Sequence, residues 1–173
     1  MDLVNLAIIS LLYILPAYIA NSSAALYGGG IPLDFGRNLR KHRIFGGGKT
    51  FIGLFIGVLC GTVAGNVEGF FLQGTSFAIG DIIFYSELGF LLSLGAMLGD
   101  LTASFIKRRL GYATGQMLPI IDQLDFVVGA IILGSTLYRP SFEMVVFLII
   151  VTPLIHVLLN AIGYLLKLKK VPW

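Results

Sequence analysis

Five long stretches of this chain carry almost no charged side chains, and they constrain its fold more than any other feature. They cover residues 3–22, 50–67, 88–106, 124–138 and 143–166. Charged residues make up 12% of the 173-residue chain, about half the usual share of a soluble domain, and hydrophobic residues make up 57%. A helix needs about 20 apolar residues to cross a bilayer. The pattern predicts an all-α integral membrane protein with about five transmembrane helices, the fourth of them short, in a single domain over residues 1–173.

The basic side chains predict how these helices are oriented. Of the 12 basic residues, all but Arg139 fall in the first loop, in the loop after the third stretch or in the tail. They are Arg37, Arg40, Lys41, Arg43 and Lys49, then Lys107, Arg108 and Arg109, and finally Lys167, Lys169 and Lys170. Loops rich in Lys and Arg stay in the cytoplasm. We therefore expect a multi-pass protein of the cell membrane with its N-terminus outside, its C-terminus cytoplasmic and its polar site facing the cytoplasm.

Acids and bases crowd into residues 99–125, between two apolar stretches. Asp100, Ser104 and Lys107 are spaced i, i+4 and i+7, so they share one face if the third stretch continues as a helix. Asp122 and Asp125 are spaced i and i+3, close enough on one helix face to hold a hard cation between them. Two structural alternatives stay open. One is an ion pair between Asp100 and Lys107, and the other is helix capping by the two later acids.

The basic run Lys107, Arg108 and Arg109 lies between these two sets of acids. Its side chains can neutralise phosphate groups that a bound cation would bridge. Cations and carboxylates in this order indicate phosphate chemistry at the membrane border.

The first loop contains two glycine runs, residues 28–30 and 46–48, on either side of a basic segment. The fragment Gly48-Lys49-Thr50 invites comparison with the Walker A motif, but Arg43 stands where that motif needs its first glycine, and no strand precedes it. What remains is a glycine-rich turn, a lysine and a threonine at a helix N-terminus, which is a favourable place for phosphate. The alternative is a flexible linker whose basic face contacts anionic lipid headgroups.

Glycines repeat every four residues along the second apolar stretch, at Gly53, Gly57, Gly61 and Gly65. They give that helix a face without side chains, which favours tight packing against a neighbour in this chain or in a second copy. Gly95 and Gly99 of the third stretch are the expected partners within the chain.

Residues 68–87, between the second and third apolar stretches, are rich in glycine and aromatic side chains and contain no Lys or Arg. We expect this segment at the outer interface, as a re-entrant or surface segment. Its acids, Glu68, Asp81 and Glu87, then lie on the face opposite the basic loops, and we expect them to be solvated.

Several of these residues form a pattern that resembles a known signature. Gly99-Asp100, Ser104, Lys107-Arg108, Pro119 and Asp122-Gln-Leu-Asp125 resemble the motif of the CTP-dependent phosphatidate cytidylyltransferases. The sequence departs from that motif at Ala113-Thr114, where Lys-Asp is usual, at Gln123, where Arg is usual, and in lacking a His-Gly-Gly element. The small size, the GGGKT entry to the second stretch and the form SFIKRRLG followed by DQLD are instead similar to the archaeal relatives, the CDP-archaeol synthases, over nearly the whole chain.

This resemblance implies transfer of CMP from CTP to 2,3-bis-O-(geranylgeranyl)-sn-glycerol 1-phosphate, which gives unsaturated CDP-archaeol and pyrophosphate. It implies Mg²⁺ as cofactor, held by Asp100, Asp122 and Asp125, with Lys107 as a further catalytic residue. The substrate-binding residues that it implies are Asn21, Arg43, Gly46, Gly47, Gly48, Lys49, Thr50, Ser104 and Arg108. The expected partners are CTP, an isoprenoid ether glycerol phosphate lipid and the membrane. A homodimer is an open question, and no nucleic acid is expected.

Three other hypotheses remain. A small membrane transporter or lipid flippase would use the acids as ion sites, but it would place them in mid-span and show related halves. A CDP-alcohol phosphotransferase would need an ordered set of acids across two helices that this sequence lacks. A non-catalytic assembly factor would tolerate loss of the acids.

Overall fold

The computed structural model describes residues 2–165 and 167, except for the side chains of residues 159–163. Its helices are α1 (Leu3–Tyr27), α2 (Phe51–Leu72), α3 (Ile82–Arg109), α4 (Ile121–Gly134) and α5 (Phe142–Leu165). Two short antiparallel strands, β1 (Asn38–Leu39) and β2 (His42–Arg43), form a hairpin between α1 and α2. The predicted helical fold is confirmed. Lys169 and Lys170 of the basic tail lie outside the described residues.

Three of the helices, α1, α2 and α3, are long and apolar enough to cross a membrane, judged by length and composition over the described residues. α4 has 14 residues, which is short for a complete span, and α5 has an apolar segment at Phe142–Leu158. α2 also exposes large apolar side chains, including Phe55 at 68% and Leu59 at 50% exposure. Such a face is unfavourable in water and favourable against lipid chains. The fold is that of a multi-pass membrane protein.

Polar caps fix where the three long helices begin. Asp2, Thr50 and Asp81 each accept a hydrogen bond from the backbone N–H three residues later, at 2.8, 3.1 and 2.8 Å. Such a bond pairs one of the amide groups left free at a helix start, and losing it costs about 1 kcal/mol. The Thr50 cap also fixes the backbone beside Lys49, which immediately precedes it.

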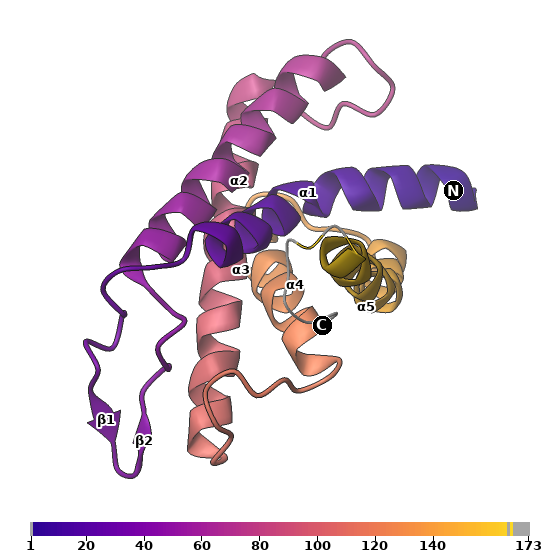
Figure 1. Ribbon diagram of the computed structural model, residues 1–173. Coiled ribbons are helices and arrows are strands. Elements are labelled where there is room, and N and C mark those ends of the chain that lie inside the picture. Colours follow the sequence, from indigo (N-terminus) through magenta and orange to yellow (C-terminus); the bar gives the residue numbers. More distant parts are fainter. Residues whose placement is uncertain (1, 166, 168–173) are drawn as a thin grey trace.

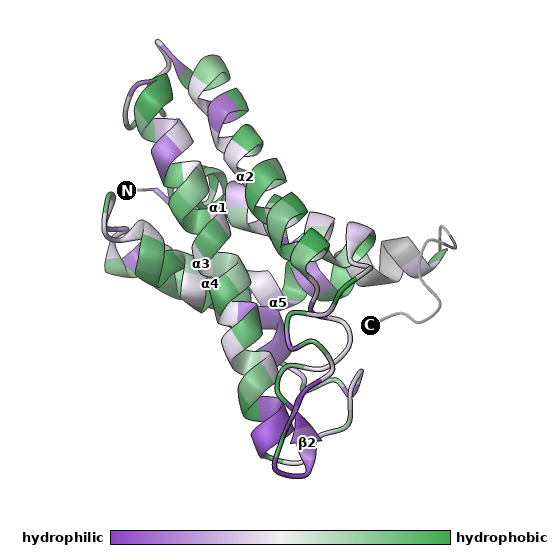
Figure 2. Ribbon diagram, turned by 90° about the vertical axis from the view of Figure 1, so that its left-hand side faces the viewer, coloured by the Kyte–Doolittle hydropathy of each residue, from purple (hydrophilic) through white to green (hydrophobic). Residues whose placement is uncertain are grey.

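The helices form an irregular bundle in which α3 packs between α2 and α4, while α1 contacts all four other helices (Figure 1). Their crossing is filled by fully buried side chains, among them Ile14, Leu92, Phe126, Val127 and Leu148. The β-hairpin lies beside the C-terminal end of α3. Polar residues gather at this end of the bundle, whereas the helices elsewhere are largely hydrophobic (Figure 2).

The glycine face of α2 packs inside the chain, against α1 and α3. A Cβ atom built on Gly61 would lie 2.6 Å from a backbone oxygen of α1, and one built on Gly65 would lie 2.8 Å from the Cα of Gly89 in α3. The predicted tight packing is confirmed, and the neighbour belongs to this chain. The predicted partner is wrong, however, because Gly95 and Gly99 face α4 instead. Small residues on two sides of α3 thus allow close packing against α2 on one side and α4 on the other.

The connection between α2 and α3 is shorter than predicted. Both helices extend past their predicted ends, so only residues 73–81 join them. Asp81 and Glu87 are exposed, as expected for solvated acids. Glu68 is only 9% exposed, so the same expectation is wrong there. The additional helical turn carries Glu68 into the interior, where it lines a small cavity together with Tyr85.

Candidate active site

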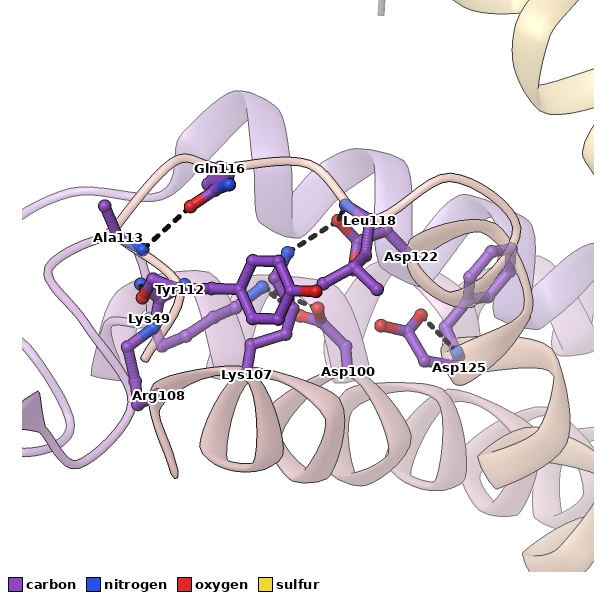
Figure 3. Close-up of polar contacts among 11 residues, drawn as sticks. Lys49, Asp100, Lys107, Arg108, Tyr112, Ala113, Gln116, Leu118, Asp122 and Asp125 are labelled. Carbon is purple, nitrogen blue, oxygen red and sulfur yellow. Dashed lines mark hydrogen bonds and ion pairs between the residues drawn. The ribbon is translucent and has the colours of Figure 1, made fainter. Parts of the chain in front are cut away.

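Residues capable of chemistry meet where α3 and α4 cross. A Cβ atom built on Gly99 would collide with the carbonyl oxygen of Asp125, and one built on Gly129 would collide with that of Gly95. Two helix backbones come this close only where glycine removes the side chain. The contact therefore brings the start of α4 beside Asp100, the residue that follows Gly99 (Figure 3).

Asp100 forms an ion pair with Lys49 of the first loop. The ammonium nitrogen of Lys49 lies 2.6 and 2.5 Å from the two carboxylate oxygens of Asp100, although 51 positions separate the residues in the sequence. The two side chains are 28% and 22% exposed, so the pair is largely shielded from water. The alternative pairing of Asp100 with Lys107 is not formed, because Lys107 reaches across to α4.

Lys107 pairs with Asp122 at the start of α4. Its ammonium nitrogen lies 2.6 Å from Oδ2 of Asp122, which also accepts the backbone N–H of Leu118 at 2.9 Å. The chain enters α4 through Ile120, whose φ of 70° is strained for a β-branched residue. Ile120 also stands at the N-cap position and makes no side-chain cap bond. Asp122 thus binds the backbone at the entry to α4 from within the first turn, as a capping acid can, whereas Asp125 makes no such bond.

Asp100 and Asp122, with the lysines that pair with them, form a charged cluster together with Asp125. Asp125 supplies its third carboxylate. It points toward Asp100 in Figure 3, accepts the backbone N–H of Phe126 at 2.6 Å, and lies within electrostatic range of Asp100 and Asp122. Across the residues that the structure describes, no three acidic, histidine or cysteine side chains already surround a point suited to a metal ion. The cluster offers hard oxygen ligands, but lysines hold two of its three carboxylates.

A small pocket of about 80 Å³, lined by both polar and apolar side chains, opens beside the Lys49–Asp100 pair, and we call it the polar pocket because these two charged residues line it. Its lining includes Asn21 from the end of α1 and Gly48, Lys49 and Thr50 from the entry to α2. Four predicted substrate residues and one predicted metal ligand are therefore gathered around one space. Their amide, ammonium and hydroxyl groups suit a polar, anionic ligand.

A second, larger space of about 560 Å³ lies between α3 and α4. Its lining is mostly apolar and includes Leu98, Ile106 and Ile132. Lys107 and Asp125 line it as well, so this apolar groove leads to the charged cluster. A groove with such a lining suits a hydrocarbon chain that carries an anionic group at one end.

Ser104 and Arg108 line neither space, as far as the described residues go. Both are buried, at 9% and 5% exposure. Arg108 donates through Nη1 to the carbonyl oxygen of Tyr112, and its Nε has no hydrogen-bond partner in the described part of the chain. A Cβ atom built on Gly46 would lie 3.7 Å from that Nε. Arg108 thus lies against the glycine turn of the first loop.

Asp34 organises the first loop, and the sequence analysis missed it. It is 3% exposed, pairs with Arg43, and accepts the backbone N–H groups of Gly36, Phe45 and Gly46 at 3.0, 3.2 and 3.1 Å. Burial acts to raise the pKa of Asp34, but the Arg43 guanidinium and the three N–H groups outweigh it and lower that pKa to about 2. The available signal was its position two residues before a glycine, which is typical of a turn closed by an aspartate.

Arg109 has a different partner from the phosphate that we predicted. It donates to the carbonyl oxygens of Leu39, His42 and Arg43 at 2.7, 3.3 and 2.6 Å. Its guanidinium carbon also lies 5.2 Å from the centre of the Phe105 ring, a distance suited to a cation–π contact. Arg109 therefore fastens the β-hairpin to the end of α3.

Comparison with known proteins agrees with this geometry. A family model described as CarS-like, CDP-archaeol synthase, matches residues 3–173. The chain is 50% identical to the CDP-archaeol synthase of Methanopyrus kandleri, over 93% of this chain and 90% of that protein. It is 42% identical to the one from Methanocaldococcus jannaschii (95% and 96% covered) and 45% identical to the one from Pyrococcus abyssi (93% and 95% covered).

A solved structure shares the fold. It is described as an intramembrane enzyme for archaeal membrane lipid biosynthesis. The similarity has a TM-score of 0.78 at 33% sequence identity, and it covers 87% of this chain and 91% of the other. Family match, sequence identity and fold agree over nearly the full length, and the chain belongs to the CDP-archaeol synthase family.

Proposed function

We propose that this chain transfers CMP from CTP to 2,3-bis-O-(geranylgeranyl)-sn-glycerol 1-phosphate and so forms unsaturated CDP-archaeol and pyrophosphate. One observation carries the proposal: Lys107 and Asp125 belong to the charged cluster and also line the apolar groove. A lipid whose chains lie in that groove would present its phosphate to this cluster. Membership of the CDP-archaeol synthase family supports the same reaction.

The reaction requires little general acid–base catalysis from the protein. An oxygen of the lipid phosphate attacks the α-phosphorus of CTP, and the bond from that phosphorus to the oxygen bridging to the β-phosphorus breaks, which releases pyrophosphate. A phosphomonoester with a second pKa of about 6 is largely dianionic at neutral pH, so this nucleophile needs no general base. The site has to supply positive charge and alignment of the two phosphates.

Mg²⁺ is the proposed cofactor, and the carboxylate oxygens of Asp100, Asp122 and Asp125 are the hard ligands that it prefers. When bound, the ion would offset the negative charge of the triphosphate and of the departing pyrophosphate. Lys49 contacts both oxygens of Asp100, and Lys107 contacts Oδ2 of Asp122, so a cation bound through these oxygens would displace the lysines. Each released ammonium group can then bind a phosphate oxygen. The proposed catalytic residues are accordingly the three aspartates and Lys107.

The polar pocket and the apolar groove would bind different substrates. The polar pocket lined by Asn21, Gly48 and Thr50 takes part of the nucleotide, with Arg43 and the turn formed by Gly46, Gly47 and Gly48 beside it. Arg108 lies against this turn and would hold it in place. Ser104, which is buried in α3, stays in the proposed set of substrate-binding residues. The lipid chains enter the apolar groove from the membrane, because its lining is hydrocarbon over most of its length.

We further propose that all five helices cross the membrane, with the N-terminus outside and the active site facing the cytoplasm. The support is the distribution of Lys and Arg, of which all but Arg139 fall in the first loop, at the end of α3 or in the C-terminal tail. In this orientation the polar pocket opens on the side where soluble nucleotides are available.

The transporter or flippase hypothesis is not favoured. Asp122 lies in the first turn of α4, and Asp100 is paired with a lysine from a loop, so neither acid stands alone in the middle of a span. Ion relays in transporters use acids at mid-membrane depth.

The direct test is transfer of label from α-labelled CTP into an organic-extractable product. Purified protein is supplied with the geranylgeranyl ether lipid phosphate and Mg²⁺, and Asp122→Asn serves as the comparison. We expect labelled lipid from the wild type and at least a hundredfold less from Asp122→Asn, with the variant still folded in detergent. Absence of label with both ether and ester lipid phosphates would reject the reaction, and activity of Asp122→Asn at raised Mg²⁺ would reject Asp122 as a main ligand.

A further inference from the structure

We infer that Asp34 is a positioning residue for the nucleotide, because it holds the glycine turn and Arg43 in the arrangement that presents Lys49 to the site. The inference rests on the proposed function, since it concerns binding of CTP at the same place. Asp34 itself does not line the polar pocket, so it acts through its neighbours.

Both carboxylate oxygens of Asp34 are fully used inside the loop. Oδ1 accepts from the backbone N–H of Gly36 and from Nη2 of Arg43, and Oδ2 accepts from Nε of Arg43. Oδ2 also accepts from the backbone N–H groups of Phe45 and Gly46. Removing this side chain would leave one guanidinium and three amide groups without this partner, and the amide of Gly46 is buried.

The backbone carries this arrangement from Asp34 to Lys49. The N–H of Leu33, next to Asp34, donates to the carbonyl oxygen of Lys49 at 2.8 Å, and the N–H of Lys49 donates to that of Gly46 at 3.4 Å. Gly46 has a φ of 99°, a value that favours glycine, and its N–H is held by Asp34. Asp34 therefore fixes the Gly46 end of the turn directly. Its neighbour Leu33 fixes the Lys49 end through the backbone hydrogen bond.

Asp34 also orients Arg43. Two nitrogens of that guanidinium, Nε and Nη2, bond Asp34, and the third, Nη1, would lie 3.1 Å from a Cβ atom built on Gly47. The ion pair thus directs the remaining nitrogen toward the turn that we assign to phosphate. A planar guanidinium held by one edge keeps its other edge in a fixed direction.

The test is steady-state kinetics with CTP as the varied substrate, on Asp34→Ala, Asp34→Asn and the control Asp81→Ala. Asp81 also accepts a backbone N–H, at 2.8 Å, but in the connection between α2 and α3. If loss of Asp34 leaves about one molecule in ten with a competent turn, the KM for CTP rises about tenfold while kcat stays within about threefold. Asp34→Asn, which keeps acceptor oxygen but not the charge, should give an intermediate KM. Asp81→Ala should leave the KM unchanged.

Hydrogen exchange gives a readout that does not depend on activity. In Asp34→Asn the amides of Phe45 and Gly46 should exchange at least about tenfold faster than in the wild type, while those within α2 keep their rates. Unchanged exchange at these two amides, or a loss of kcat at unchanged KM, would overturn the inference. A different result would separate the two proposals. If Asp34→Asn exchanges faster as expected but the wild type forms no labelled lipid, the proposed function is rejected and the role of Asp34 in the loop stands.

Discussion

α3 makes two close contacts through glycine residues, and they differ in what lies beside them. In the first, which we name the α2 contact, Gly57, Gly61 and Gly65 pack against α1 and α3. In the second, the α3–α4 contact, Gly95, Gly99 and Gly129 bring two helix backbones together. The α2 contact builds the apolar part of the bundle. The α3–α4 contact lies directly under the carboxylate cluster, so it determines the geometry of the site.

The largest expected effect is that of Gly99→Ala. The new Cβ atom would collide with the carbonyl oxygen of Asp125, which is backbone and cannot turn away. α4 would have to move, and Asp125 would move relative to Asp100. A shift of about 1 Å in a catalytic arrangement can cost about a hundredfold in rate, and we expect a loss of that size in label transfer from CTP.

The matched control is Gly57→Ala in the α2 contact. Its Cβ atom would lie 2.7 Å from Sδ of Met97, a flexible side chain that can adjust, and 3.0 Å from the backbone oxygen of Ala20, so α1 would have to move by only a few tenths of an ångström. We expect turnover within about threefold of the wild type. Equal losses in Gly99→Ala and Gly57→Ala would show that the two contacts do not differ in the way described.

A larger side chain at Gly57 should damage assembly more than nucleotide binding. Gly57→Leu fills the space between α1, α2 and α3, where overpacking typically costs about 1–3 kcal/mol. We expect a reduced yield of monodisperse protein in detergent by size-exclusion chromatography. The folded fraction should bind CTP within about threefold of the wild-type affinity. A stable but inactive Gly57→Leu protein would contradict this separation of roles.

The smallest expected effect is that of acid on the first loop, which should become less stable when Asp34 is protonated. The pKa of Asp34 is lowered from 3.8 to about 2, so its ionised form stabilises the loop above about pH 4, and this contribution is lost as the pH falls through about 2. The loss amounts to at most about 2 kcal/mol. Hydrogen exchange of residues 34–46 between about pH 5 and pH 2.5 should reveal it, after correction for intrinsic rates. Asp34→Asn should remove this pH dependence, and an unchanged dependence in that variant would assign it to another group.

The charge-free stretches predicted the helices because an apolar run of helical length has few other stable arrangements in a bilayer. Boundaries were less certain where polar residues continue a helix. The structure extends α2 through Glu68 and starts α4 at Ile121, before Asp122. Hydropathy cannot show this, since a buried acid lowers the apolar score of a helix that packing still stabilises.

The sequence predicted which residues belong to the site better than it predicted which of them form ion pairs. Helical spacing showed that Asp100 and Lys107 can share a face, but it could not show that Lys49 arrives from the first loop and that Lys107 turns to Asp122. Those choices depend on how α3 meets α4 and on the shape of the loop. Asp34 was missed because its partners are mostly backbone amides, which leave no pattern of side chains in a sequence.

The most direct test of the account compares the partly buried Asp125 with the buried Glu68, since one acid lies beside each contact. Asp125→Asn and Glu68→Gln each replace one carboxylate with an amide of the same shape, the first at the α3–α4 contact and the second on the buried face of α2. Mg²⁺-dependent formation of labelled lipid from CTP is measured for both, on protein shown to be folded. We predict at least a hundredfold loss for Asp125→Asn and a change within about threefold for Glu68→Gln. Full activity of Asp125→Asn, or an equal loss in Glu68→Gln, would contradict the claim that the crossing of α3 and α4 builds the active site.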